Sequence, residues 1–198
     1  MAASTINAIT LFFSLLAIVA GAITVAIALS AASGDRLGVI AVLRPVALEL
    51  AAAVATTAMV GSLVLSEVIG FEPCLNCWIQ RGFMYPAAFL LIGSLTLKRP
   101  ILAKVAGWLA IPGLAVSIFH RYEQAVGTEI GGLCAASAPC STKFVEHFGF
   151  MTIPTMAGCG FAAIIALVAI SAWRRARPAD PSSIAARLRS GESSLAQP

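Results

Sequence analysis

The sequence is poor in charged residues. Only 11% of its 198 residues are Asp, Glu, Lys or Arg, 59% are hydrophobic, and the mean hydropathy is +0.92. A soluble domain carries about 25% charged residues, so this composition excludes a water-soluble globular protein. The net charge of +4 would suit nucleic acid or anionic lipid, but the charges lie in short clusters between apolar runs, as in membrane-protein loops. We therefore expect an integral membrane protein with no nucleic-acid partner.

Long runs of the chain have few or no charges. A membrane helix needs about 20 mostly apolar residues. Five segments are close to that length: 8–32, 50–66, 78–97, 101–119 and 151–173. The third contains Arg81 near its beginning, and the fourth contains Lys104 near one end. The sequence therefore predicts an all-α integral membrane protein with five spans.

Basic residues are scarce outside three connecting segments. Ten of the 13 Lys and Arg lie in these segments: Arg36, Arg44, Lys98, Arg99, Lys104, Arg174, Arg175, Arg177, Arg187 and Arg189. Lys and Arg are enriched in cytoplasmic loops. We therefore expect the C-terminus in the cytoplasm, and the N-terminus with segments 67–77 and 120–150 on the extracytoplasmic side.

The first apolar run lacks the positively charged start of a signal peptide. Ala31 and Ala32 do offer small residues for cleavage, but cleavage would place Arg36 and Arg44 outside and reverse the alternation of spans. We expect an uncleaved helix, with a signal peptide as the alternative. Segment 178–198 is rich in Pro, Ser and Ala and is predicted to be a disordered cytoplasmic tail.

Cysteines are few, and four of the five lie in the two outer segments. Such pairs are often structural disulfides, but Cys74 and Cys77 form a C-x-x-C, a spacing typical of redox cycling. The motif opens directly into an apolar run, and a helix start carries unpaired N–H groups and partial positive charge. That field stabilises a thiolate, more strongly at Cys77 than at Cys74. Cys159 lies mid-span and is predicted to pack as a small hydrophobe.

Arg81 follows Cys77 by four residues, on the same face of the predicted helix. A charge in a span costs about 2.5–3.5 kcal/mol at the helix centre and indicates a functional site. The alternative is that Arg81 extends to the lipid headgroups. A guanidinium beside the motif can stabilise the Cys77 thiolate and a negative charge that develops on an electron acceptor.

Cys134 and Cys140 lie in a loop rich in Gly, Ala, Ser and Pro. Their bond would close a small ring, and small exposed rings are often labile. Taken alone, a structural disulfide and a redox role are equally compatible with this loop. The following segment, 143–150, places three Phe among polar residues and is predicted to lie at the membrane interface. His147 within it is predicted to be solvated and without a catalytic role.

Three stretches together resemble a known family. They are GSLVLSEVIGFEPCLNCWIQRGFMYP (61–86), SIFHRYEQ (117–124) and CAASAPCSTKFVEHFGFMTIP (134–154). A C-x-x-C alone is common, but the series C-x-x-C-W-I-Q-R, H-x-x-E, C-x5-C and G-F-x-T-I-P is specific. It resembles disulfide bond formation protein B (DsbB), and more narrowly its Gram-positive-type, BdbC-like branch, over roughly residues 57–173.

The resemblance implies a fold and an activity. The last four runs would form a four-helix transmembrane bundle within residues 46–177, and residues 1–45 would be an extra helix and loop absent from the usual family plan. The activity would be that of a thiol:quinone oxidoreductase of the bacterial inner membrane. It would reoxidise an extracytoplasmic DsbA-like thioredoxin-fold dithiol oxidase and pass two electrons to ubiquinone or menaquinone, supporting disulfide formation in exported proteins.

The resemblance also implies roles for the four cysteines. The loop pair would oxidise the partner, with Cys134 as the target of the partner thiolate. Cys140 would then pass electrons to Cys74, and Cys77 would face the quinone. This loop pair is closer together than in the best-known proteobacterial form, although the spacing suits the BdbC-like branch.

Three further residues gain roles from the same resemblance. Arg81 matches the arginine that contacts the quinone in the family. His120 lies near the place of a family histidine beside the quinone. Together with Glu123, one helical turn later, His120 could supply a proton to the reduced ring. A histidine that is merely satisfied at the interface is the alternative.

Three other functions compete with this one. In the vitamin K epoxide reductase family the loop pair precedes the C-x-x-C, the reverse of the order here. Thiolates also bind zinc or Cu(I), but the second pair lacks the spacing usual for zinc, and Arg81 would repel a cation, so we expect no metal. A structural membrane protein with two inert disulfides is the third alternative.

Overall fold

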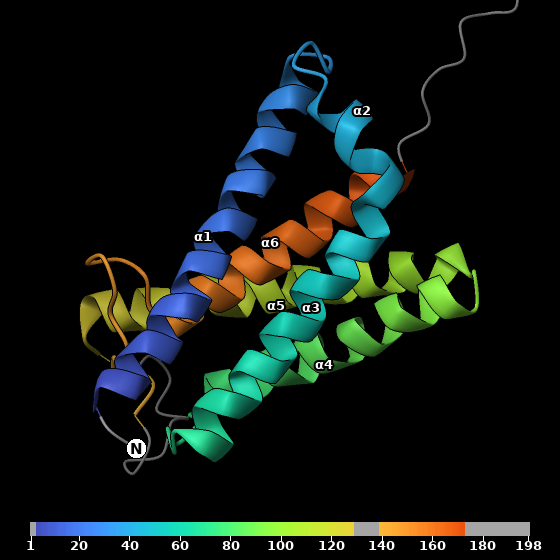
Figure 1. Ribbon diagram of the computed structural model, residues 1–198. Helices are drawn as coiled ribbons and strands as arrows, with labels where there is room; N and C mark the ends of the chain where they lie inside the picture. Colours follow the sequence, from blue (N-terminus) through green and yellow to red (C-terminus); the bar gives the residue numbers. More distant parts are fainter. Residues whose placement is uncertain (1–2, 129–138, 173–198) are drawn as a thin grey trace, which may run out of the picture.

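The computed structural model describes residues 3–128 and 139–172, and the regular structure within these ranges is helical (Figure 1). The elements are α1 (Ala3–Ala32), α2 (Val39–Leu43), the 3-10 turn η1 (Arg44–Val46), α3 (Ala47–Leu63), the π-helical turn η2 (Val64–Val68), α4 (Leu75–Thr96), α5 (Pro100–Val126) and α6 (Ile153–Ala172). The prediction of an all-α membrane protein is confirmed. Cys134, Trp173 and the predicted tail lie outside the described residues.

Within residues 3–128 and 139–172, four helical segments are long and apolar enough to cross a membrane: Ala3–Ala32, Val39–Val68, Pro100–Val126 and Ile153–Ala172. Helix α4 has a suitable length of 22 residues but is less apolar, because it includes Gln80 and Arg81. Large apolar side chains are exposed on the outer surface, among them Phe89 (64%) and Trp108 (73%). Such a surface suits lipid better than water. The chain is a multi-pass membrane protein.

The second helical segment begins earlier than the sequence predicts, at Val39 instead of residue 50. A tight turn after α1 makes this early start favourable. Within it, Asp35 Oδ1 accepts hydrogen bonds from Ser30 Oγ (2.7 Å) and from the Ile40 backbone N–H (3.1 Å). Arg44 therefore lies within the helical run, and Pro45 interrupts the α-helical ladder there because it has no N–H to donate.

Helices α3 to α6 pack as a four-helix bundle, and α1 packs along α6. Small residues let these helices approach closely. At Gly113 of α5 an added Cβ would lie 2.4 Å from the ring of Phe161 on α6, and at Gly107 it would lie 3.0 Å from Val168. Close packing of small residues drives helix association where lipid is as apolar as the side chains.

One end of the molecule collects the segments that carry the C-x-x-C and Cys140. The start of α1, the end of η2, the start of α4, the end of α5 and the start of α6 all lie there, at the lower left of Figure 1. We call it the cysteine end. The turns that carry Arg36, Lys98 and Arg99 lie away from it. The alternation of chain direction thus brings segment 67–77 together with residues 120–128 and 139–150.

Candidate functional site

The C-x-x-C forms the first turn of α4. Cys74 has an extended backbone, and its carbonyl oxygen accepts a hydrogen bond from the Trp78 N–H (3.1 Å), which starts the helix. Cys77 lies in the first turn, and both cysteines are free thiols with their sulfur atoms 3.3 Å apart. The predicted position of the motif at a helix start is therefore correct.

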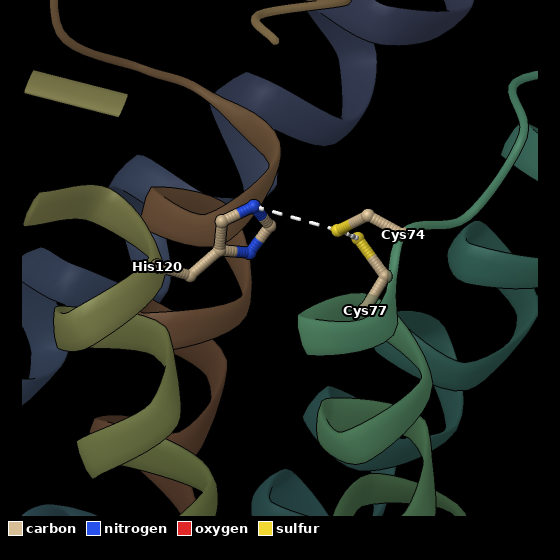
Figure 2. Close-up of side chains that lie close together, drawn as sticks. All are labelled: Cys74, Cys77 and His120. Carbon is tan, nitrogen blue, oxygen red and sulfur yellow. Dashed lines mark hydrogen bonds between the residues drawn. The ribbon is translucent and has the colours of Figure 1, made fainter. Parts of the chain in front are cut away.

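His120 projects from α5 toward Cys74 (Figure 2). Its Nε2 lies 3.7 Å from Cys74 Sγ and 3.1 Å from the carbonyl oxygen of Cys140. Because a carbonyl oxygen can only accept, Nε2 carries the hydrogen, and this one N–H serves both neighbours. His120 is buried, and its Nδ1 has no hydrogen-bond partner among the described residues.

Hydrogen bonding favours a thiolate at Cys74. Once Cys74 is ionised, the S–H of Cys77 and the N–H of His120 both donate to it. These contacts outweigh burial and lower the pKa of Cys74 from 9.0 to about 4. Cys77 then holds the proton. The sequence instead predicted the thiolate at Cys77. The hydrogen bonds from the Cys77 thiol and from His120 stabilise a thiolate at Cys74 more than the helix start stabilises one at Cys77.

Cys140 reaches the C-x-x-C from the other outer segment. Its side chain is fully buried against Cys74, and its sulfur is engaged in a disulfide. The segment is held beside α5 by His120 and by Gln124, whose Nε2 donates to the Thr142 carbonyl oxygen (3.0 Å). The structure thus brings together three of the four predicted cysteines, while Cys134 lies outside the described residues.

Asn76, inside the motif, is a site residue that the sequence analysis missed. Its Nδ2 donates to Glu123 Oε2 of α5 (2.5 Å), and both side chains are buried. This hydrogen bond joins the first turn of α4 to the last turns of α5. Glu123, one helical turn after His120, therefore contacts the Asn76 side chain inside the C-x-x-C. The signal available in the sequence was a polar residue between the two cysteines.

Arg81 is held inside the bundle and does not extend to the surface. Its Nε donates to Ser62 Oγ (2.8 Å) and its Nη2 to the Ser62 carbonyl oxygen (2.9 Å). Its Cζ also lies 5.3 Å from the centroid of the Trp78 ring, a cation–π distance. Ser62 stands shortly before the π-helical turn η2, and such turns are frequent at functional sites. The sequence analysis identified neither feature.

A cavity of about 360 Å³ opens between α1, α3, α4 and α6. Cys77, Gln80 and Arg81 line one end, and apolar side chains line most of the remainder. The volume is in the range of small-molecule sites. A largely apolar cavity with a fixed guanidinium and a thiol at one end fits a quinone, an apolar two-electron acceptor with polar ring oxygens. The residues that line the cavity do not include His120 or Glu123.

The cysteine cluster also has some features of a metal site. Ligand atoms of Cys74, Cys77 and His120 all lie within 4.8 Å of one another. Structural zinc takes four protein ligands. The nearest further cysteine, Cys140, is disulfide-bonded and so offers no thiolate. The group is thus one ligand short of a structural zinc site among the described residues.

Two other predictions concern residues away from the C-x-x-C. Cys159 is a free thiol packed on α1, where a Cβ added at Gly21 would lie 3.4 Å from its sulfur. This agrees with its predicted packing role. The prediction that His147 is solvated is wrong: it is half-buried, and its Nε2 lies 2.9 Å from Thr10 Oγ1 of α1. The interaction needs α1 beside the outer segment, which sequence spacing does not show.

Comparison with known proteins identifies the family. Residues 44–173 match the family described as Disulfide bond formation protein DsbB. The chain is 42% identical over 113 residues to Probable disulfide formation protein of Oceanobacillus iheyensis, covering 56% of this chain and 77% of the relative. It is 40% identical over 119 residues to Disulfide bond formation protein C of Bacillus subtilis, covering 57% and 82%. It is 33% identical over 134 residues to Probable disulfide formation protein C 2 of Bacillus anthracis, covering 68% and 96%.

No solved structure matches the chain. The family match begins at Arg44 and so includes α3 to α6 but not α1. It covers the free dithiol at the start of α4, the disulfide-bonded cysteine packed against it, and the walls that α3, α4 and α6 contribute to the cavity beside Arg81. A membrane disulfide oxidoreductase has these parts. The chain belongs to the disulfide bond formation protein DsbB family, and its relatives are disulfide formation proteins of the BdbC-like branch.

Proposed function

We propose that the protein is a thiol:quinone oxidoreductase that reoxidises a DsbA-like thioredoxin-fold dithiol oxidase. One observation supports this most directly. Cys74 is in contact with disulfide-bonded Cys140, while Cys77, in the same motif, lines the apolar cavity beside Arg81. The C-x-x-C therefore has a sulfur partner on one side and a site for an electron acceptor on the other.

The first exchange takes place at the loop pair. A thiolate of the reduced partner attacks Cys134 of the Cys134–Cys140 disulfide and releases the Cys140 thiolate. The second thiolate of the partner attacks its own first sulfur and releases Cys134. The partner leaves as a disulfide, and two electrons remain on the loop pair. Each exchange requires an attacking thiolate and a reachable disulfide sulfur.

The second exchange takes place between the pairs. The Cys140 thiolate attacks Cys74 of the Cys74–Cys77 disulfide, and Cys77 leaves as a thiolate. Cys134 then attacks Cys140, restores the loop disulfide and releases Cys74. The two electrons now lie on Cys74 and Cys77. The described state, with Cys140 oxidised and Cys74 and Cys77 as free thiols, matches this stage of the cycle.

The chain supplies specific groups for the last step. The chemistry supplied by a bound quinone is acceptance of two electrons and two protons as the Cys74–Cys77 disulfide reforms. Arg81 would stabilise negative charge on the acceptor, because its guanidinium is fixed at the same end of the cavity as Cys77. His120 keeps Cys74 as the thiolate that closes the disulfide onto Cys77. We propose this role for His120 in place of the direct contact with the quinone that the sequence resemblance implied.

We place the protein in the bacterial inner membrane with the cysteine end extracytoplasmic and the C-terminus cytoplasmic. The excess of basic residues in the segments away from the cysteine end supports this orientation. A membrane-impermeant thiol reagent applied to intact spheroplasts should therefore label reduced Cys74. Labelling only after the membrane is broken would contradict the orientation.

Anaerobic turnover tests the activity. Oxidised protein is mixed with a reduced thioredoxin-fold oxidase and either ubiquinone or menaquinone, and quinone absorbance is followed. We expect one quinone reduced for each partner dithiol oxidised. Cys77→Ser should abolish quinone reduction, whereas the control Cys159→Ser, at a free cysteine packed on α1, should keep it. Turnover by Cys77→Ser, or no reduction of either quinone by the unsubstituted protein, would overturn the proposal.

Metal binding is the second candidate, because Cys74, Cys77 and His120 lie close together. A metal-binding protein and an oxidoreductase should differ in the metal content of the purified protein. Elemental analysis of the purified reduced protein would then find about one zinc or copper per chain, lost in Cys74→Ser. We expect metal well below one per chain and a dithiol that the quinone oxidises directly.

A further inference from the structure

Helix α1 forms a wall of the cavity that holds Cys77 and Arg81. Six of its residues line the cavity, and all six are apolar: Phe13, Leu16, Ala17, Val19, Ala20 and Ile23. The family match begins only at Arg44. This wall is therefore built from a part of the chain that the family similarity does not cover.

The cavity is long, and its two ends differ. Along α3 and η2 its lining extends from Leu50 to Ser66, about 24 Å at 1.5 Å per helical residue. Ser62, Gln80 and Arg81 gather at the cysteine end. Toward Leu50 and Ile23 the lining is almost wholly apolar. The cavity therefore has a polar head and an apolar slot that continues from it between α1 and α3.

We propose that α1 is the tail-binding wall of the quinone site. The isoprenoid tail of the quinone would lie in the slot along α1, while the ring is held near Cys77 and Arg81. This inference rests on the proposed quinone chemistry and adds the part of the ligand that α1 recognises. The slot is continuous with the ring end of the cavity, which is why we assign it to the tail of the same molecule.

The wall would act through shape more than through hydrophobic burial. A tail that leaves the bilayer exchanges one apolar environment for another, so little free energy is gained by the transfer. A narrow slot can still orient the tail and so position the ring at Cys77. We therefore expect α1 to set the preference among tails and the apparent affinity for long-tailed quinones.

Contacts along α1 hold the wall in place. The Phe13 ring rests on Gly61 of α3, where an added Cβ would lie 2.8 Å from the ring. At the cysteine end, Thr10 contacts His147. At the other end, Ser30 donates to Asp35 in the turn before α2. A helix fixed at both ends can keep a slot of constant width.

A matched pair of substitutions tests the wall. Ala17 lines the slot, whereas Ala22 lies one and a half turns later, is exposed and does not line it. Ala17→Leu should raise KM for a long-tailed quinone about tenfold, the size expected from overfilling a packed site. A short-tailed quinone should be affected less than about twofold on the same grounds. Ala22→Leu should match the unsubstituted protein with both.

Ligand binding gives a readout independent of turnover. A quinone with a photoreactive group at the end of its isoprenoid tail is bound to the unsubstituted protein, irradiated, and mapped by mass spectrometry. We expect labelled peptides from residues 13–23 and from α3, and competition by unlabelled long-tailed quinone. Because no substitution is needed, this result decides the question even if Ala17→Leu does not fold.

The outcomes separate this inference from the function on which it rests. If the protein reduces no quinone, the proposed function itself fails. If quinone is reduced but Ala17→Leu affects short-tailed and long-tailed quinones equally, or if the label is absent from α1, the inference that α1 binds the tail is overturned and the proposed function stands. A photoreactive phospholipid that labels residues 13–23 and is not displaced by long-tailed quinone would assign the slot to lipid and also overturn the inference.

Discussion

The two sulfurs of the C-x-x-C lie in different surroundings. Cys74 faces α5 and the outer segment, where His120 and Cys140 provide hydrogen bonding and a disulfide. Cys77 faces a largely apolar cavity whose lining includes the guanidinium of Arg81 and the carboxyl group of Glu72. The difference suggests a division of function between the two sulfurs of one helical turn. Thiol exchange would take place at Cys74, and electron transfer to an acceptor at Cys77. Given this division, substitutions on the two sides of the motif should affect different half-reactions.

Arg81→Ala should separate the two half-reactions most strongly. Removing a fixed donor from a site where negative charge develops costs about 10²–10³ in rate, so quinone reduction by the dithiol should fall by that factor. Exchange between the loop pair and its partner should change little. Stopped-flow measurement of each half-reaction checks this, and equal losses in both would remove the role assigned to Arg81.

The reactivity of Cys74 should persist into acid. Its pKa is lowered to about 4, so the thiolate is present above that value and is lost as pH falls through it. Alkylation of the reduced protein, with Cys74 modification followed by mass spectrometry, should stay nearly constant from pH 8 to about pH 5 and decline near pH 4. A decline centred near pH 8 or 9 would mean that the thiol is unperturbed.

His120→Leu should raise the pH at which that alkylation declines, because Cys74 loses a donor to its thiolate. A hydrogen bond to a charged group contributes about 1.5–3 kcal/mol, or about ten- to hundredfold in the ionisation equilibrium of Cys74, so closure of the Cys74–Cys77 disulfide at pH 4 should slow by about tenfold or more. His120→Gln keeps a side-chain N–H and should recover part of the rate. An unchanged pH profile in His120→Leu would show that His120 does not stabilise the Cys74 thiolate.

Ser62→Ala should have a smaller effect, confined to the Cys77 side. It removes the hydroxyl that accepts from Arg81 Nε but leaves the Ser62 carbonyl oxygen, which accepts from Nη2. A loss of about 1.5 kcal/mol corresponds to about a tenfold rise in KM for quinone. Ser171→Ala, which removes a hydroxyl bonded only locally to Val168, is the control. Altered partner exchange in Ser62→Ala would contradict the division.

Thr10→Val should give the smallest change. It removes the hydrogen bond between α1 and His147, which contributes about 1 kcal/mol to stability. The midpoint of thermal unfolding should fall slightly while both half-reactions stay near their original rates. Thr24→Val on the same helix removes only a hydroxyl bond to the Ala20 carbonyl and provides the comparison. An equal fall in both variants would show that the contact with His147 adds nothing.

Sequence patterns predicted the features that depend only on residues close together in the chain. The apolar runs, the helix start at the C-x-x-C and the placement of Arg81 four residues after Cys77 all follow from spacing along one element. The direction of His120 toward Cys74 does not, because it depends on the rotation of α5 relative to α4. The anchoring of Arg81 by Ser62 likewise requires the packing of α3 on α4.

The role of α1 was beyond sequence analysis for a similar reason. An apolar helix looks the same in sequence whether it faces lipid on all sides or lines a cavity on one. Only tertiary packing shows that Phe13 rests on Gly61 and that Cys159 contacts Gly21. The helical start at Val39 was missed because Arg44 and Pro45 resemble loop residues, while the capping by Asp35 is visible only in the folded turn.

The single Nε2–H of His120 affects the stage of the cycle at which the Cys74 thiolate is most strongly stabilised. It is shared between the Cys140 carbonyl oxygen and the Cys74 sulfur, and one hydrogen cannot serve both fully. When the outer segment moves away to meet its partner, the carbonyl departs and the whole donor turns to Cys74. Departure of the segment would thus strengthen the hydrogen bond from His120 to Cys74, so that the Cys74 thiolate is more strongly stabilised while Cys140 is absent and less strongly when it returns.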